Sequence, residues 1–251
     1  MIRAYRFKTG CQSIDDMLNG GIESGIVTEV FGRAGSGKTN FCIQLAAQAL
    51  KNNKKVAYID TEEISIDRVS QIFGDNVQEM LKNLAYYNAN SFSNQQQAIG
   101  HLDDLLTNDY GIIILDSATA LYRLEIIEHT TPEESVQTRR NLLKQLEMLK
   151  KLSQKYNIPV VITNQVYDDL KHENNVLPLG GNGTRHSLKA SLKFEKEENG
   201  IRIATINRHR SLPEGVTCQF KIENSGLISL DDVEIPDEIN NTDDDEFRFL
   251  T

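Results

Sequence analysis

The residues from Gly32 to Thr39 have the types and the spacing of a phosphate-binding loop. In such a loop, glycines let backbone N–H groups close around phosphate oxygens, a lysine places a positive charge beside the β- and γ-phosphates, and a hydroxyl reaches Mg²⁺. The full match to G-x-x-x-x-G-K-[ST] consists of Gly32, Arg33, Ala34, Gly35, Ser36, Gly37, Lys38 and Thr39. We therefore expect ATP and Mg²⁺ to bind here, with Lys38 supplying the charge and Thr39 the hydroxyl.

The chain on either side of the loop has the pattern that this motif requires. Residues 26–31 form a predominantly apolar run that is typical of a buried strand, and residues 40–50 favour a helix. The amino end of that helix would point its positive dipole at a bound phosphate. Because a chance glycine-rich turn does not need this order of strand, loop and helix, a nucleotide-binding loop is the better interpretation.

Three polar side chains that follow other predicted strands complete a candidate catalytic site. Asp116 ends an apolar strand, where it would hold Mg²⁺ through water at the carboxyl edge of the sheet. Glu62 follows another strand, where a carboxylate can orient and polarise the water that attacks the γ-phosphate. Gln165 follows a third and would sense the γ-phosphate for the loop after it. Simpler interpretations remain open: a turn residue for Asp116, and a solvated loop acid for Glu62, with Glu63 beside it.

Continuous apolar strands predict a parallel sheet that is covered on both faces. They lie at residues 26–31, 55–59, 111–115 and 158–163. A long helix before the last strand begins with the capping sequence at residues 131–134. Its Leu142, Leu146 and Leu149 recur at helical spacing and should face the sheet.

From residue 188 onward the pattern changes to short segments with alternating side chains. They lie at residues 188–194, 201–207 and 218–222. Asn199 and Gly200 between the first two segments indicate a hairpin, so we expect the sheet to finish antiparallel. The predicted fold class is α/β, a phosphate-loop ATPase core with a mostly parallel central sheet, helices on both faces and an antiparallel C-terminal extension.

Composition restricts the compartment in which this chain works. Its 251 residues and 39% hydrophobic content suffice for one sizeable core, and no apolar run approaches the length of a membrane span. Cys11, Cys42 and Cys218 lack the spacing of disulfide-bonded or metal-binding cysteines. These features predict a soluble cytoplasmic protein without a membrane partner.

The formal net charge of −9 comes almost entirely from the end of the chain. Residues 231–251 hold nine acidic side chains and a single basic one, so residues 1–230 are nearly neutral. We expect one ATPase domain over residues 1–230 and a disordered acidic tail over residues 231–251. Phe247, Phe249 and Leu250 after the charge run also fit a short docking peptide.

Ordered segments of the chain resemble the ATPase core of the RecA-type recombinases, in the branch of archaeal RadA and the eukaryotic recombinases. They include residues 9–10, 13–15, 18–25, 60–62, 115–123 and 161–166. The resemblance implies a RecA-like fold and a place for Arg68 against the adenine. It also implies that Arg208 and Arg210 are basic fingers that enter a neighbouring protomer's active site. Residues 180–182 and His186 resemble the family's segment after the second DNA loop.

The chain departs from RadA in the segments that assemble filaments and bind DNA. Its first helical segment is expected close to Met1, so we expect the helix-hairpin-helix domain and the Phe-x-x-Ala filament segment to be missing. The family's first DNA loop carries glycine and basic residues, whereas residues 124–134 here are acidic, and phosphate contacts need cations. The second loop, at residues 167–178, is mixed in charge. Glu63 replaces a glycine that usually follows the catalytic glutamate, which predicts slow hydrolysis.

The resemblance implies an accessory protein of homologous recombination and DNA repair. Such a protein binds ATP and Mg²⁺, is a weak ATPase, binds DNA with modest affinity, and modulates the main recombinase and branched-DNA processing without driving strand exchange. Expected partners are DNA, a RadA-type recombinase, a Holliday-junction resolvase and further copies of the chain. Two alternatives stay open: a self-sufficient strand-exchange recombinase, and a KaiC-like signalling ATPase that acts on protein.

Overall fold

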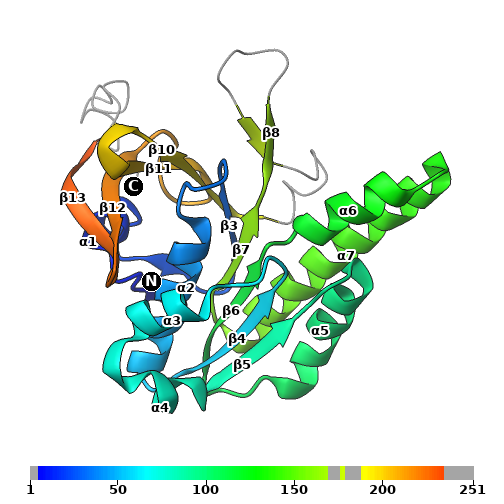
Figure 1. Cartoon of the computed structure of the whole chain (residues 1–251), viewed down its shortest axis with the longest axis horizontal. Helices are drawn as coiled ribbons and strands as arrows, with labels where there is room; N and C mark the ends of the chain where they lie inside the picture. Colours follow the sequence, from blue (N-terminus) through cyan, green and yellow to red (C-terminus); the bar gives the residue numbers. More distant parts are fainter. Residues whose placement is uncertain (1–4, 169–175, 179–187, 235–251) are drawn as a thin grey trace, which may run out of the picture.

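The computed structural model describes residues 5–168, 176–178 and 188–234. The main feature of this part is a nine-stranded sheet with helices on both faces (Figure 1). Its parallel strands are β3 (Val27–Phe31), β4 (Lys55–Asp60), β5 (Leu84–Asn88), β6 (Tyr110–Asp116), β7 (Val160–Asn164) and β10 (Ala190–Lys196). They lie in the order β10-β3-β7-β6-β4-β5. The parallel sheet predicted from the apolar runs is therefore confirmed.

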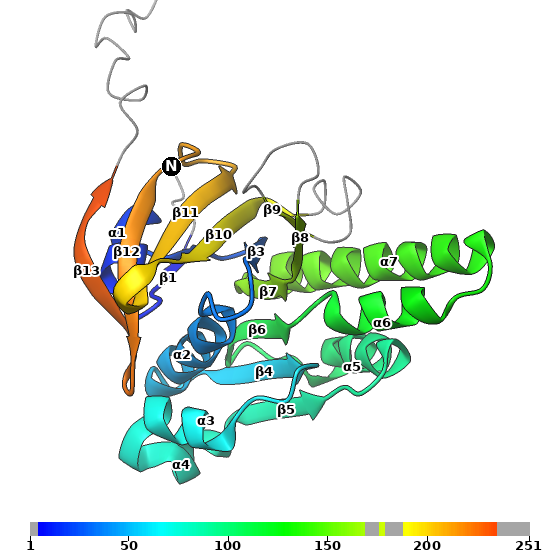
Figure 2. The same ribbon diagram turned by 45° about the horizontal axis from the view of Figure 1, so that its top comes forward.

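Helices cover both faces of the parallel strands and enclose two apolar cores (Figure 2). One face carries α2 (Lys38–Lys51), α3 (Ile66–Phe73), the 3₁₀ turn η1 (Gly74–Asn76) and α4 (Val77–Leu81), and the other carries α5 (Phe92–Leu105), α6 (Ala120–Glu128) and α7 (Pro132–Tyr156). Helix α7 begins with the predicted capping box between Thr131 and Glu134. Its Leu142, Leu146 and Leu149 are buried in the second core, as their spacing predicts.

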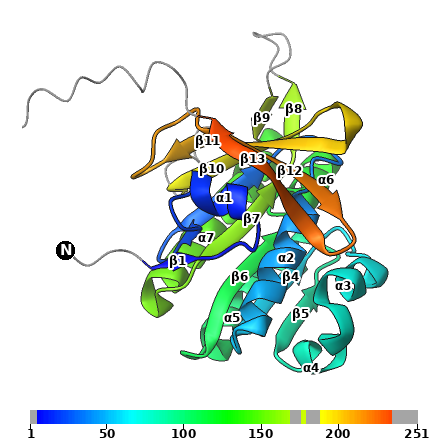
Figure 3. The same cartoon turned by 90° about the vertical axis from the view of Figure 1, so that its left-hand side faces the viewer.

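The sheet finishes antiparallel, as the alternating segments predict. These strands are β11 (Ile201–His209), β12 (Thr217–Glu223) and β13 (Gly226–Glu234). The predicted hairpin joins β10 to β11 through the 3₁₀ turn η2 (Glu198–Gly200), where Asn199 and Gly200 have φ values of 55° and 78°. Helix α1 (Gln12–Met17) packs on β12 and β13, and Ser13 donates its hydroxyl to the Gln219 carbonyl over 2.9 Å (Figure 3).

Short strands lie on either side of α1 in the chain and after β7. They form two antiparallel pairs, β1 (Arg6–Phe7) with β2 (Ile22–Glu23), and β8 (Val166–Asp168) with β9 (Val176–Pro178). The first described helix, α1, begins at Gln12, after the short strand β1. None of the described helices is long and apolar enough to cross a membrane.

Two regions with predicted roles lie wholly or partly outside the described residues. The end of the acidic tail, residues 235–251, is one of them, while β13 continues to Glu234 and so passes the expected domain end at residue 230. The other region is formed by residues 169–175 and 179–187, which include most of the second loop, residues 180–182 and His186. Their predicted roles stay predictions.

An ionic cluster around the buried Glu23 connects β2 to the end of β11. Buried Glu23 is ion-paired with Arg6, whose Nη2 lies 3.3 Å from Glu23 Oε2, and it accepts from Arg210 Nε over 2.7 Å. His209 Nε2 lies 3.7 Å from the same carboxylate, and its Nδ1 accepts the Ser211 N–H over 3.1 Å. Burial and the positive charges of Arg6 and Arg210 lower the pKa of His209 to about 4. The negative charge of Glu23 opposes this effect. The imidazole is therefore neutral at pH 7.

We expect His209 to make the folded protein less stable in acid. The unfolded chain binds a proton at this residue below pH 6.5, whereas the folded chain does so only near pH 4. The free energy of unfolding should therefore fall as the pH drops between these values, by at most about 3 kcal/mol.

Urea unfolding across this pH range measures the effect. In His209→Asn, the amide oxygen can still accept from Ser211, and this part of the fall in the free energy of unfolding at low pH should disappear. The control is His101→Asn at an exposed position, which should lose stability in acid as the original chain does. The same acid loss in His209→Asn as in the original chain would contradict the prediction.

Candidate active site

The loop from Gly32 to Thr39 joins the carboxyl end of β3 to the amino end of α2. Gly35 and Gly37 have positive φ values of 77° and 106°, which glycine adopts without steric cost. A Cβ atom at Gly32 would lie 2.1 Å from the Phe194 carbonyl oxygen of β10, so this close approach requires glycine. The glycines of the motif therefore shape the loop and let it pack against the neighbouring strand.

Two side chains of the loop indicate where a phosphate fits. Lys38 Nζ donates to the carbonyls of Gly32 and Arg33 over 2.9 and 3.2 Å. Burial lowers the pKa of Lys38, and two nearby carboxylates oppose this effect. The hydroxyl of Ser36 is buried, and among the described residues it has no hydrogen-bond partner. A lysine ammonium group and an unpaired hydroxyl at the amino end of a helix suit the phosphates of ATP.

Asp116 lies buried at the end of β6, next to the loop. Its carboxylate accepts hydrogen bonds from Tyr58, over 3.1 Å, from Thr163 and from Thr39. Burial raises the pKa of Asp116, and the bonds from Thr163 and Thr39 oppose that rise. A hydroxyl and a carboxylate placed together in this way suit Mg²⁺, which takes oxygen ligands and water. Within the described ranges, no cluster of three or more His, Cys, Asp or Glu side chains offers another metal site.

Glu62 and Gln165 follow different strands and are in direct contact. Gln165 Nε2 donates to Glu62 Oε1 over 2.9 Å. The negative charge of Glu62 also raises the pKa of Lys38, whereas that of Glu63 raises the pKa of Tyr86. Glu63 is exposed and has a φ of 60°, the left-handed conformation that glycine favours. Of the two acids, Glu62 is therefore the one beside the phosphate loop.

Behind Gln165 lies a buried polar network that the sequence motifs do not reveal. Glu29 of β3 is buried and accepts from Asn164 Nδ2 over 2.7 Å and from Ser191 Oγ over 2.8 Å. The Thr119 hydroxyl donates to Asn164 Oδ1 over 2.5 Å and accepts the Gln165 N–H over 3.4 Å. Its one sign in the sequence is a carboxylate inside a predicted buried strand. The network connects Gln165 to β3, which pairs with β7, and to Thr119 at the amino end of α6.

Arg68 on α3 is bonded to the protein itself. Its Nη2 donates to the Glu223 carbonyl over 2.7 Å, its Nη1 to the Asn224 carbonyl over 3.1 Å, and its Nε to the Asn40 side chain. Asn40 directly follows Thr39 of the loop, so the guanidinium lies near the start of α2. These bonds connect α3 to the turn between β12 and β13. The contact of Arg68 with an adenine stays a prediction.

Arg208 and Arg210 lie away from the phosphate loop of their own chain. Strand β11 is antiparallel to β10, and β10 is parallel to β3, so the last residues of β11 lie toward the amino end of β3. The phosphate loop follows the opposite, carboxyl end of β3. Arg208 donates to the Leu188 carbonyl over 2.9 Å, and Arg210 is ion-paired with Glu23. A finger role for either arginine therefore needs a second protomer, and it stays a prediction.

A different arginine of β11 lies beside the loop. Arg202 Nη2 donates to the Gly35 carbonyl over 3.3 Å. The motif does not include this residue, and its only sequence signal is its position just after the predicted hairpin turn at Asn199 and Gly200.

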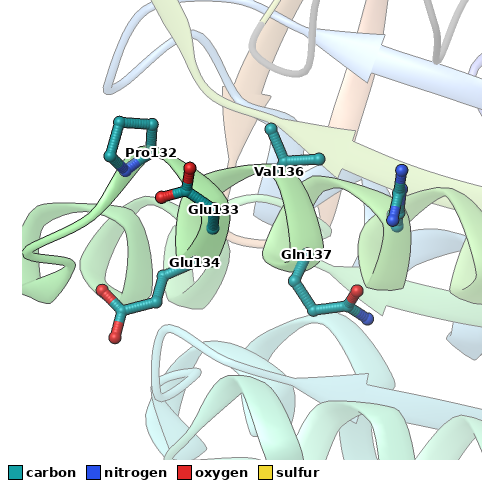
Figure 4. A pocket seen from close by; sticks show the side chains of 6 residues that line it. Pro132, Glu133, Glu134, Val136 and Gln137 are labelled. Atoms are coloured by element: carbon teal, nitrogen blue, oxygen red, sulfur yellow. The ribbon is translucent and has the colours of Figure 1, made fainter.

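The acidic segment at residues 124–134 is largely helical rather than a loop. Helix α6 continues to Glu128, and α7 begins at Pro132. The apolar side chains of Leu124 and Ile127 are exposed. A pocket of about 600 Å³ on the first turns of α7 is lined by Pro132, Glu133, Glu134, Val136, Gln137 and Arg140 (Figure 4). Two carboxylates against one guanidinium leave this pocket with a net negative charge, which is poorly suited to DNA phosphates.

Comparison with known proteins gives a consistent result. A family model described as Rad51 matches residues 3–230. The DNA repair and recombination protein RadB of Methanococcoides burtonii is 44% identical, over 87% of this chain and 96% of its own. The RadB proteins of Thermoplasma acidophilum and Archaeoglobus fulgidus are 38% and 37% identical, over 88% and 87% of this chain and 93% and 96% of theirs. A crystal structure of the RadB recombinase superposes with a TM-score of 0.76 at 32% identity, and the match covers 90% of this chain and 100% of that one.

Proposed function

The chain belongs to the Rad51 family, and from this premise we propose that it is an ATP-binding accessory protein of homologous recombination and DNA repair. Its RecA-like fold, expected from the sequence, is confirmed by the superposition on the RadB recombinase. The similarity to DNA repair and recombination proteins over most of the chain also supports this proposal over a signalling ATPase that acts only on protein.

The main support for the proposal is that polar side chains from several strands lie together at the carboxyl edge of the parallel sheet. Lys38 and the loop's N–H groups bind the β- and γ-phosphates, and Thr39 and Asp116 hold Mg²⁺, which neutralises phosphate charge when bound. Glu62 orients and polarises the attacking water. Gln165, bonded to Glu62 over 2.9 Å, senses the γ-phosphate and passes its presence to the segment that follows.

We propose slow hydrolysis for two reasons. Glu63 stands in a left-handed conformation directly after Glu62, where a glycine would be unstrained. The proposed fingers, Arg208 and Arg210, do not reach the loop of their own chain, so transition-state charge is neutralised fully only when a second protomer supplies them.

The acidic segment at residues 124–134 supports modest DNA affinity and a regulatory rather than a strand-exchange role. The proposed partners are DNA, a RadA-type recombinase, a Holliday-junction resolvase and further copies of this chain, and the proposed compartment is the cytoplasm. In this role, the chain modulates the main recombinase and branched-DNA processing in response to bound ATP.

An ATPase assay with and without single-stranded DNA, run beside a strand-exchange assay, tests this proposal. We expect weak Mg²⁺-dependent hydrolysis, no strand exchange by this chain, and a changed strand-exchange rate when it is added to a RadA-type recombinase. Efficient strand exchange by this chain without other proteins would overturn the accessory role. Failure to bind DNA at any salt concentration would favour an ATPase that acts on protein.

A further inference from the structure

Asp60 holds the backbone of the segment that carries Glu62. It is the last residue of β4, and its side chain is buried. Its Oδ1 accepts the Glu62 N–H over 3.0 Å, and its Oδ2 accepts the Ile64 N–H over 2.7 Å. One carboxylate thus bonds to the backbone on both sides of Glu63. This arrangement fixes the backbone at Glu62, just after the strand, and therefore the direction of the Glu62 side chain.

A tyrosine of the neighbouring strand donates to the same carboxylate. The Tyr86 hydroxyl of β5 donates to Asp60 Oδ2 over 2.6 Å, and its ring lies 6.2 Å from that of Tyr58. Partial burial and this bond raise the pKa of Tyr86, so the phenol stays a donor at neutral pH. Tyr86 is still 42% exposed, and removal of its hydroxyl alone leaves the apolar ring in place. Hydrogen bonds to a carboxylate are among the stronger ones, and this bond restrains Asp60 at the edge of the sheet.

We propose that Tyr86 and Asp60 are positioning residues for ATP hydrolysis, and that they hold Glu62 where it faces the phosphate loop and Gln165. The inference rests on the ATPase function proposed above. Tyr86 acts on Asp60, Asp60 acts on the backbone of Glu62, and Glu62 acts on the attacking water. The hydrogen bonds described above join Tyr86 to Asp60 and Asp60 to the backbone at residues 62 and 64, so we expect the chain of contacts to affect turnover and to leave nucleotide affinity unchanged.

The variant Tyr86→Phe tests this inference with little change in shape. A displacement of about 1 Å at a catalytic group can cost about 100-fold in rate, and partial loss of restraint should lower kcat on the order of tenfold. The KM for ATP and the melting temperature should stay close to those of the original chain. The matched control is Tyr87→Phe, the same change on the next residue of β5, where the ring packs against the other core.

Hydrogen exchange provides a readout that does not depend on turnover. In Tyr86→Phe, the backbone amides of Glu62 and Ile64 should exchange faster, because their common acceptor has lost its restraint, and Tyr87→Phe should leave them unchanged. If the original chain has no ATPase activity, the proposed function fails, but this exchange measurement still decides whether Tyr86 positions the segment.

Combination with Glu62→Gln separates a positioning role from a general loss of structure. When Tyr86 acts through Glu62, Tyr86→Phe lowers kcat no further in the Glu62→Gln background. Equal losses in Tyr86→Phe and Tyr87→Phe, a fall in melting temperature with a rise in KM, or additive effects in the double variant would each overturn the inference. Unchanged kcat and exchange in Tyr86→Phe would do so as well.

Discussion

ATP affinity should fall about 100-fold when Lys38 is replaced by alanine, which corresponds to about 3 kcal/mol of binding free energy. The ammonium group of Lys38 bonds to the Gly32 and Arg33 carbonyls of the loop, at 2.9 and 3.2 Å from Nζ, so it lies against the backbone that must surround the phosphates. Without it, the negative charge of the β- and γ-phosphates would face the Asp116 and Glu62 carboxylates without the Lys38 charge that lies near both.

Isothermal titration with ATP and Mg²⁺ measures this loss. The matched control is Lys51→Ala, which removes the same charge from the far end of α2 and should leave ATP affinity unchanged. Circular dichroism of both variants confirms that the helix is retained. ATP affinity that survives the Lys38 substitution would mean that the nucleotide binds elsewhere on the protein.

The phosphate loop and the parallel strands are predictable because their signals are local. Glycine at a fixed spacing permits one backbone path, and an uninterrupted apolar strand has to be covered on both faces. These two facts bring Lys38, Asp116, Glu62 and Gln165 to one edge of the sheet, since each follows a parallel strand. The hydrogen bond between Glu62 and Gln165 agrees with that expectation.

The groups that support the site are not predictable in the same way, because their partners are set by strand register. Tyr86 reaches Asp60 only because β5 pairs with β4, and β5 itself is a half-exposed edge strand with a weak apolar pattern. Glu29 meets Ser191 because β10 lies next to β3, although the two residues are far apart in sequence. No motif encodes such pairs.

Arginine side chains and the acidic end of the chain show a second limit of prediction from sequence. The sequence places Arg210 near the end of β11, but its pairing with Glu23 depends on how β2 packs there. Asp231, Asp232 and Glu234 belong to β13, the last strand at its edge of the sheet, and edge strands tolerate charged residues. A count of acids therefore does not show that β13 continues to Glu234.

Turnover should fall at least about 100-fold when Glu62 is replaced by glutamine, while ATP affinity changes by no more than about twofold. The amide has nearly the shape of the carboxylate and still presents an oxygen to Gln165 Nε2, so the contact of 2.9 Å can persist. It cannot polarise or deprotonate the attacking water. Because the substitution also removes a negative charge near the phosphates, ATP should bind at least as well as before.

Single-turnover hydrolysis and nucleotide titration, measured on the same preparation, separate these two effects. The matched control is Glu63→Gln, the same change one residue later, on a side chain whose charge acts on Tyr86 rather than on Lys38. It should retain most of the turnover. If Glu63→Gln abolishes hydrolysis and Glu62→Gln does not, the catalytic carboxylate is Glu63, and the contact between Glu62 and Gln165 would then restrain the loop without activating water.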